Sequence, residues 1–172
     1  MQPAYEVIGD YLSQRAPKVF GLMGDANMRY LARYIDGPGR FISSVHESGS
    51  VSMADGYARA SGGVGVASVT HGPAVTNTVT ALTEAAQFGT PLVVVTGSTR
   101  PGKNIFQNID LASVVAPTGA IYQRIESVDA LISGLDEAFE TAQRELLPVV
   151  CDIPVWVESA TVEHSMIRPA AH

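Results

Sequence analysis

One carboxylate in this sequence stands between an apolar run and a run of small residues. Residues 41–45 form a short apolar segment typical of a β-strand, and Glu47 follows at the start of residues 47–60, which are typical of a helix. Glycine, serine and alanine dominate this helix, so little bulk surrounds the carboxylate. A flat ligand could approach Glu47 closely, which makes this residue a candidate for handling a proton.

Two interpretations of Glu47 stay open from the residues alone. Ser44 to Glu47 fits the Ser-x-x-Glu pattern of a capping box, in which the glutamate reaches back to the backbone of Ser44. In the alternative, Glu47 is a buried acid that donates or accepts one strong hydrogen bond to a ligand. The first interpretation makes Glu47 structural, and the second makes it catalytic.

In a second segment, residues 70–77, a stretch of backbone that a ligand can approach leads into the start of a helix. Gly72 and Pro73 permit this approach, but the segment lacks the lysine of a P-loop and the glycine spacing of a dinucleotide fingerprint. An ordinary turn before a capped helix is therefore an equal alternative. His71 is either a donor in the site or a loop histidine, and the spacing of the four histidines does not indicate a zinc site.

The elements that must position these residues alternate between strand-like and helix-like segments. This alternation predicts an α/β fold, a three-layer doubly wound parallel sheet of about six strands with helices on both faces. The predicted strands are residues 18–23, 41–45, 64–70, 91–96, 120–125 and 148–153. The predicted helices are residues 4–15, 28–35, 47–60, 76–88, 110–115 and 128–145.

Four loops follow the carboxyl ends of predicted strands. They are residues 24–27, 46–47, 71–77 and 97–107. Ligands of open parallel sheets bind at this edge, so the four loops are expected to form one site. The run that begins at Phe106 also fits an ordinary helix start with an apolar anchor.

Composition limits the classes of protein and partner. A formal net charge of −6 without a basic stripe argues against nucleic acid, and no apolar run approaches the length of a membrane span. The first residues do not resemble a signal peptide, and Cys151, the one cysteine, lies in an apolar run typical of a buried thiol. We expect a cytoplasmic protein with one domain over residues 1–157 and a loosely ordered tail over residues 158–172.

The segments resemble one family when they are read in order. Residues 46–59, His-Glu-Ser-Gly-Ser-Val-Ser-Met-Ala-Asp-Gly-Tyr-Ala-Arg, resemble the H-E-x-x-A-x-x-M-A-x-G-Y-A-R stretch of thiamine-diphosphate enzymes of the acetolactate synthase and 2-oxo acid decarboxylase group. The run Thr70-x-Gly72-Pro73-x-x-x-Asn77 is similar to that family's T-x-G-P-G-x-x-N. The resemblance continues through residues 91–97, 106–107 and 148–154, covers roughly residues 3–155, and is to the N-terminal pyrimidine-binding domain.

The resemblance implies roles for five residues. In the family, the residue matching Glu47 hydrogen-bonds the N1′ nitrogen of the thiamine diphosphate aminopyrimidine, and the cofactor acts as electron sink for the decarboxylation of a 2-oxo acid. By the same resemblance, Gly72, Pro73 and Asn77 line the pyrimidine, and Gln107 faces the reacting carbon.

This sequence departs from the family where the substrate is expected. Residues 24–27 read Gly-Asp-Ala-Asn in place of G-x-P-G, Ala74 replaces a glycine, and Asn108 replaces a glutamate. His71 stands where a small residue is common. Asn27 and His71 among these departures, and Phe106 beside Asn108, are the candidates for the substrate side of the site.

The family's magnesium motif, G-D-G followed by N, has no match in these residues. The resemblance therefore implies no metal site in this chain, and a diphosphate-binding subunit or domain of the same enzyme that holds Mg²⁺. The sequence is either a naturally split subunit of a hetero-oligomer, which we favour, or a fragment of a longer protein. We expect the pyrimidine-binding subunit of a split, acetolactate synthase-like enzyme that decarboxylates a 2-oxo acid, with or without carboligation to an acyloin. The alternatives are a subunit like those of sulfopyruvate or phosphonopyruvate decarboxylase, a non-catalytic regulatory subunit that kept the fold, and, less favoured, a stand-alone flavodoxin-like binding domain.

Overall fold

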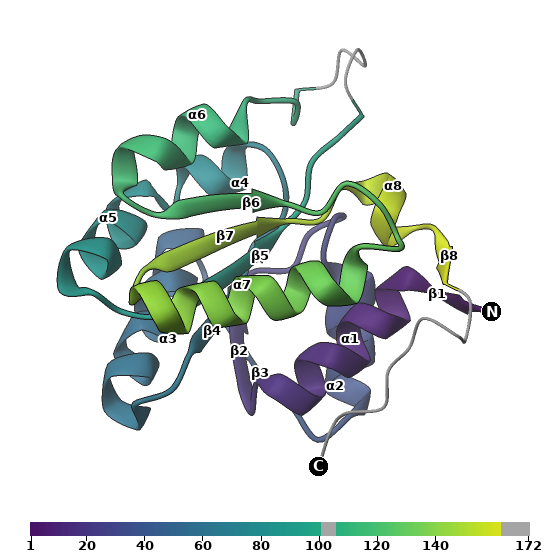
Figure 1. Ribbon diagram of the computed structural model, residues 1–172, viewed down its shortest axis with the longest axis horizontal. Coiled ribbons are helices and arrows are strands. Elements are labelled where there is room, and N and C mark those ends of the chain that lie inside the picture. The colour runs from purple at the N-terminus through teal and green to yellow at the C-terminus, as the bar shows by residue number, and fades with distance from the viewer. Residues whose placement is uncertain (101–105, 163–172) are drawn as a thin grey trace.

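A parallel sheet forms the centre of the molecule (Figure 1). The computed structural model describes residues 1–100 and 106–162, and within them the large sheet has six strands in the order β3-β2-β4-β5-β7-β6, every neighbouring pair parallel. Helices cover both faces, which confirms the predicted three-layer α/β fold. The strands are β2 (Lys18–Gly21), β3 (Arg40–Ser43), β4 (Gly65–Ser68), β5 (Leu92–Thr96), β6 (Ile121–Arg124) and β7 (Pro148–Asp152).

The middle of the sheet is β4, β5 and β7, in which every residue is buried. Strands covered on both faces favour continuous runs of β-branched apolar residues, and β5 shows such a run in Leu-Val-Val-Val-Thr. The edge strands β3 and β6 contain no fully buried residue. Each predicted strand occurs, with ends that differ from the prediction by at most two residues.

One face of the sheet, which we call the α1 face, carries α1 (Ala4–Arg15), α2 (Met28–Asp36), α7 (Leu131–Glu145) and the short α8 (Val155–Glu158). Ile8, Leu12 and Leu135 are fully buried in the core on this face. They pack in one cluster with Val93 and Val149 of the sheet. The apolar stripes of α1 and α7 therefore fix this layer.

The opposite face, which we call the α3 face, carries α3 (Glu47–Ser61), α4 (Pro73–Thr76), α5 (Val79–Phe88), α6 (Leu111–Val115) and the 3₁₀ turn η1 (Ala116–Thr118). Val51 and Leu82 are buried here with Val94 of the sheet. Helix α3 lies very close to β4, since a Cβ on Gly65 would stand 2.3 Å from the carbonyl oxygen of Ala54. The small residues of α3 permit this approach.

The helix predicted over residues 76–88 is interrupted in the structure. Helix α4 ends at Thr76, Asn77 is its C-cap residue, and α5 begins at Val79. The hydroxyl of Thr76 donates to the carbonyl of Pro73 (2.6 Å), and that of Thr78 donates to the carbonyl of Val75 (2.7 Å). Such side-chain bonds compete with the helical ladder, and the interruption leaves Asn77 at the rim of the sheet.

The start of the predicted C-terminal tail is corrected by the structure. Strand β8 (Thr161–Val162) pairs antiparallel with β1 (Gln2–Pro3), and the backbone N–H of Ala4 donates to the carbonyl of Ala160 (2.9 Å). Glu158 closes α8 and is buried. Residues 158–162 therefore belong to the folded body, and the rest of the predicted tail, residues 163–172, lies outside the described residues.

Two further features follow from the core. Cys151 is fully buried in β7, and burial raises the pKa of its thiol to about 12, as expected for an unreactive cysteine. No helix in residues 1–100 and 106–162 has the length and apolar character that crossing a membrane requires.

Candidate functional site

Helix α3 begins at Glu47, but not through the predicted capping box. The cap residue is His46, whose Nδ1 accepts a hydrogen bond from the backbone N–H of Ser48 (3.2 Å). The backbone N–H of Ser44, which the glutamate was expected to reach, donates to the carbonyl of Gly21 instead (2.8 Å). The capping-box interpretation is therefore wrong, and the side chain of Glu47 is left to make a contact elsewhere.

That contact is with Asn77, thirty residues further along the chain. The amide Nδ2 of Asn77 donates to Oε2 of Glu47 at 2.9 Å. Glu47 is half-buried, whereas Asn77 is exposed and the nearby Val45 is fully exposed. The two side chains thus form a fixed carboxylate–amide pair on an open part of the α3 face.

Gly72 brings the β4–α4 loop against the segment that carries Gln107. Its backbone has φ +67°, and a Cβ at this position would lie 2.4 Å from the carbonyl oxygen of Gln107. Only glycine satisfies both conditions without strain. Pro73 follows as the first residue of α4 and is exposed, so Gly72, Pro73, Asn77 and Gln107 come from adjacent loops of one rim.

Phe106 does not pack against these residues through a buried side chain. It is 81% exposed, and Gln107 beside it is half-buried. The preceding part of the predicted loop, residues 101–105, lies outside the described residues. The substrate-side role of Phe106 therefore stays a prediction.

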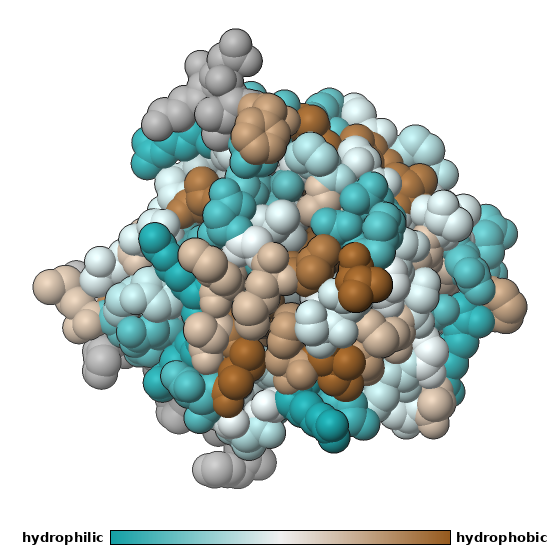
Figure 2. Space-filling view, turned by 180° about the vertical axis from the view of Figure 1, so that it is seen from behind, coloured by the Kyte–Doolittle hydropathy of each residue, from teal (hydrophilic) through white to brown (hydrophobic). Residues whose placement is uncertain are grey.

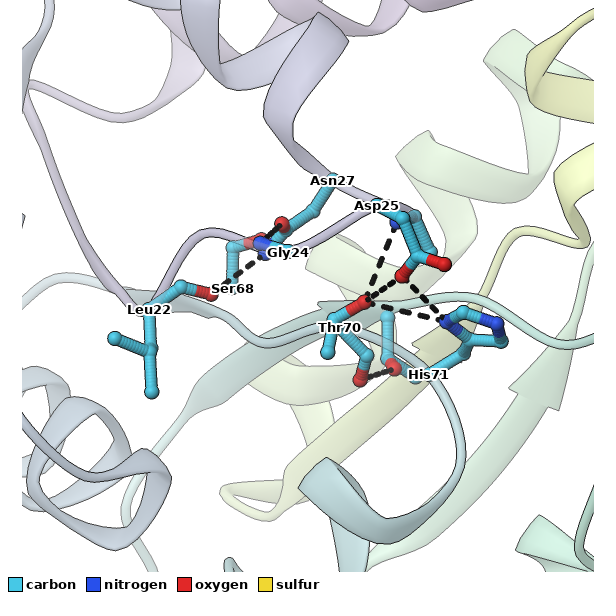
Figure 3. A network of polar contacts seen from close by, with 9 residues as sticks. Leu22, Gly24, Asp25, Asn27, Ser68, Thr70 and His71 are labelled. Carbon is cyan, nitrogen blue, oxygen red and sulfur yellow. Dashed lines mark hydrogen bonds and ion pairs between the residues drawn. The ribbon is translucent and has the colours of Figure 1, made fainter. Parts of the chain in front are cut away.

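Asn27 has a structural role and does not face a substrate. It is fully buried, its Oδ1 accepts from the backbone N–H of Gly24 (2.7 Å), and its Nδ2 donates to the carbonyl of Leu22 (3.1 Å) and to Oγ of Ser68 (3.0 Å) (Figure 3). These bonds use both polar atoms of the side chain and shape the turn between β2 and α2. The expectation that Asn27 faces the substrate is corrected, because its polarity is used inside the fold.

His71 joins the same turn to the end of β4. Its Nδ1 lies 3.2 Å from Oγ1 of Thr70 and 3.3 Å from Oδ1 of Asp25, and the hydroxyl of Thr70 also donates to Asp25 (3.0 Å) (Figure 3). His71 is buried and lines a cavity of about 430 Å³ on the α1 side of the rim, together with Glu158 of α8. Sequence reasoning placed Glu158 in the tail and missed its contribution to this cavity.

The comparisons with known proteins agree with this arrangement. The family model of the thiamine pyrophosphate enzymes' N-terminal TPP-binding domain matches residues 3–114. The chain belongs to the thiamine pyrophosphate enzyme family. It represents the N-terminal, pyrimidine-binding domain of that family, and thiamine diphosphate is the family's cofactor.

Three relatives of this TPP-binding domain illustrate the relationship. The mitochondrial acetolactate synthase catalytic subunit of Saccharomyces cerevisiae is 36% identical over 156 residues, with 88% of this chain and 23% of the relative covered. The mitochondrial acetolactate synthase catalytic subunit of Aspergillus candidus is 34% identical, with 96% of this chain and 25% of the relative covered. The acetolactate synthase isozyme 2 large subunit of Escherichia coli is 32% identical, with 99% of this chain and 34% of the relative covered. The TPP-binding domain thus spans between about a quarter and a third of these relatives.

The residues of the α3 face fit the pyrimidine part of thiamine diphosphate. The carboxylate of Glu47 accepts a hydrogen bond from Asn77 on open surface, and Gly72, in the loop that leads to Asn77, places bare backbone against Gln107. A flat ring with nitrogen donors and acceptors could meet both. Within residues 1–100 and 106–162, no group of three or more His, Cys, Asp or Glu side chains could hold a metal ion.

Proposed function

We propose that this chain supplies the pyrimidine half of a thiamine-diphosphate site in an acetolactate synthase-like enzyme. The reaction is the decarboxylation of a 2-oxo acid, with or without carboligation of the product to an acyloin. The hydrogen bond between Asn77 and Glu47 is the observation that carries this proposal. The names of the relatives, which are acetolactate synthases, support the choice of reaction.

Glu47 and Asn77 have different roles at the pyrimidine. Bound thiamine diphosphate supplies the electron sink that a 2-oxo acid needs to lose CO₂. Glu47 holds a proton at the N1′ nitrogen of the ring, and Asn77 engages one carboxylate oxygen so that the other can face the ring. An oriented carboxylate avoids the entropy cost of ordering it during each turnover.

Gly72, Pro73 and Gln107 complete this half of the site. Gly72 lets the backbone stand close to the ring, and Pro73 fixes the first turn of α4 beside it. Gln107 lies against Gly72. In this proposal its side chain would face the reacting carbon. His71 and Phe106 are the remaining candidates for contact with the substrate.

A partner must cover the open face before this chemistry can proceed. Val45, Pro73 and Asn77 are exposed, and Figure 2 shows apolar side chains gathered across the middle of one face of the molecule. Water would compete for Glu47 until a second surface excludes it. We propose that a diphosphate-binding subunit or domain of the same enzyme, which also holds Mg²⁺, covers this surface.

The test combines the chain with a diphosphate-binding subunit or domain. Release of CO₂ from pyruvate is measured with thiamine diphosphate and Mg²⁺ present. Glu47→Gln should lower the rate by about 100-fold or more, since it removes a general acid–base group. Glu84→Gln on α5 removes an exposed carboxylate from the same face and should leave the rate unchanged.

Three results would overturn parts of the proposal. Equal rates for Glu47→Gln and Glu84→Gln would show that Glu47 has no role in the reaction. Full activity of this chain without any partner would show that the activity does not depend on a partner. Faster turnover of sulfopyruvate or phosphonopyruvate than of pyruvate would replace the acetolactate synthase-like reaction with one of those decarboxylations.

A further inference from the structure

The segment that leads from the sheet to Glu47 has little apolar packing. Ser43 ends β3 and is exposed, Val45 is fully exposed, and His46 is exposed as well. Ser44 and Glu47 are only partly buried. Because packing contributes little here, hydrogen bonds must fix the direction of the carboxylate if it is to be oriented before a ligand binds.

One of these hydrogen bonds spans Glu47. His46 is the cap residue of α3, and its Nδ1 accepts from the backbone N–H of Ser48 (3.2 Å). The bond therefore joins the residues on either side of Glu47 and closes a ring that contains the Glu47 backbone. A side chain that bonds to the backbone two residues further on restricts the φ and ψ of the enclosed residue.

Two serines hold the backbone of the cap residue. The hydroxyl of Ser44 donates to the carbonyl of His46 (2.9 Å), and the backbone N–H of Ser50 donates to the same carbonyl (3.3 Å). The hydroxyls of Ser44 and Ser50 lie 2.7 Å apart, and Ser50 is the donor between them because Ser44 uses its proton at the carbonyl. Ser50 is fully buried, so these bonds anchor His46 to the interior of the α3 face.

The imidazole of His46 can form this cap in only one charge state. Nδ1 accepts a hydrogen bond only without a proton, so the ring must be neutral and carry its proton on Nε2. Protonation of Nδ1 would remove the acceptor and place a positive charge at the positive end of the helix dipole. Both effects would loosen the first turn of α3, where Glu47 lies.

The charged groups around α3 leave the cap to His46. Glu47 is its charged neighbour on the same helix, and among the elements packed against α3, β2 carries Lys18 and α5 carries Glu84. Lys18 lies 4.6 Å from the centre of the Tyr57 ring, about three turns along the helix from His46. Within residues 1–100 and 106–162, neither Glu84 nor another carboxylate forms an ion pair with His46.

We infer that His46 is a positioning residue for Glu47 in the reaction proposed above. Its neutral imidazole caps α3, the two serines hold its carbonyl, and Asn77 then binds a carboxylate whose backbone is already fixed. His46 acts through the helix and not by touching the cofactor. The inference rests on the proposed function, because the direction of Glu47 matters to the rate only where the carboxylate meets the pyrimidine.

Two substitutions of His46 test the inference in the assay of CO₂ release from pyruvate, with a diphosphate-binding subunit or domain present. His46→Ala removes the acceptor, so kcat should fall about 10-fold while KM stays near the wild-type value, since Glu47 is not assigned to substrate binding. His46→Asn should restore most of the rate, because asparagine is among the preferred cap residues.

Gly62→Ala is the matched control. Gly62 caps the other end of α3 at φ +72°, and a Cβ there meets nothing within 4 Å, so the substitution strains the backbone without creating a clash. It should lower the urea unfolding midpoint and leave kcat unchanged. The control separates the direction of Glu47 from the stability of the helix that carries it.

The pH profile distinguishes positioning by His46 from a cap without influence on the reaction. Histidine side chains change charge between pH 5 and pH 8. The wild-type kcat should fall as the pH decreases across this range, and that of His46→Asn should fall less, because its cap oxygen does not titrate. Burial raises the pKa of Glu158 to about 7, but Glu158 is the same in both proteins and does not affect their difference.

A measurement without the cofactor makes the test independent of turnover. In the full chain alone, the proton chemical shift of the Asn77 side-chain amide reports its bond to Glu47. His46→Ala should move this shift toward its value in Glu47→Ala, whereas His46→Asn should leave it near the wild-type value. An unmoved shift in His46→Ala would show that His46 does not orient Glu47.

The activity measurements can also overturn the inference. Wild-type kcat in His46→Ala, an equal loss in Gly62→Ala, or identical pH profiles for the wild type and His46→Asn would each do so. If Glu47→Gln slows turnover and His46→Ala does not, this inference fails and the proposed function stands. If Glu47→Gln has no effect, the proposed function fails, and the Asn77 shift still decides whether His46 orients Glu47. If His46→Ala does not fold, the pH profile of His46→Asn decides.

Discussion

The two sides of the sheet's carboxyl edge differ in how completely this chain builds them. On the α3 face, Glu47 has one described hydrogen bond, to Asn77, and the surface around the pair is open. On the α1 face, Glu158 and His71 line a cavity whose walls come from this chain, and both residues are buried. Residues 70–72 lie between the two regions.

This difference indicates what each region needs. The pair on the α3 face already has its geometry, but it requires a second surface to exclude water. The cavity on the α1 face is lined by this chain, and among the described residues Oε1 of Glu158 and Oγ1 of Thr99 in its lining residues have no hydrogen-bond partner. Two asparagines, Asn27 on the α1 side and Asn77 on the α3 side, offer the clearest test of this difference.

The largest effect is expected from Asn27 set against Asn77. Asn27→Ala removes hydrogen bonds to three groups, the carbonyl of Leu22, the N–H of Gly24 and the hydroxyl of Ser68. The free energy of unfolding should fall by about 4 kcal/mol, because the buried partners stay unpaired. Asn77→Ala should change it by less than about 0.5 kcal/mol, since Asn77 is exposed. Equal urea unfolding midpoints for the two variants would contradict the contrast.

A somewhat smaller effect is expected from the titration of Glu158. The folded state raises the pKa of this carboxyl from 4.5 to about 7, so the folded protein binds more protons than the unfolded chain between these values. The contribution of Glu158 to stability is therefore complete below about pH 4.5 and is lost as the pH rises through about 7. The loss should be at most about 3 kcal/mol. Between pH 5 and pH 8, the free energy of unfolding in urea should decline less in Glu158→Gln than in the wild type. Identical declines would show that Glu158 is not the group whose titration lowers the stability.

The smallest effect on stability is expected at Gly72, which lies in the loop between the two regions. Gly72→Ala places a Cβ against the backbone of Gln107 at a positive φ, which should cost about 2 kcal/mol of stability. Gly56→Ala on α3 is a matched control, because a Cβ there meets nothing within 4 Å, and it should stabilise the helix by up to about 1 kcal/mol. Both are measured by urea unfolding.

Much of the fold could be predicted because its signals are local. The valine-rich run of β5 and the amphipathic pattern of α7 depend on residues that are neighbours in the chain. The break between α4 and α5 was missed, since Thr76 and Thr78 are compatible with a helix until their hydroxyls bond to backbone carbonyls.

The site was predicted less completely, because its contacts join distant residues. Glu47 was identified by its place after a strand, but its capping-box partner was wrong: the N–H of Ser44 is used by Gly21 of the neighbouring strand. Asn27 was taken for a substrate contact because its loop departs from the family's G-x-P-G, and only its burial and hydrogen bonds show otherwise. No sequence pattern marked Glu158, because its segment shows no clear helical or strand periodicity.

The amino-acid sequence by itself determined the order of strands and helices, the family, and the identity of Glu47 as the carboxylate of interest. Local propensities and apolar periodicity act between residues close in the chain, and a motif keeps its spacing whatever surrounds it. The tertiary structure decided that Asn77 holds Glu47, that Asn27 is structural, and that Glu158 and Arg29 face one cavity. Hydrogen-bond partners and desolvation depend on groups brought together from distant parts of the chain, so these decisions had to wait for the fold.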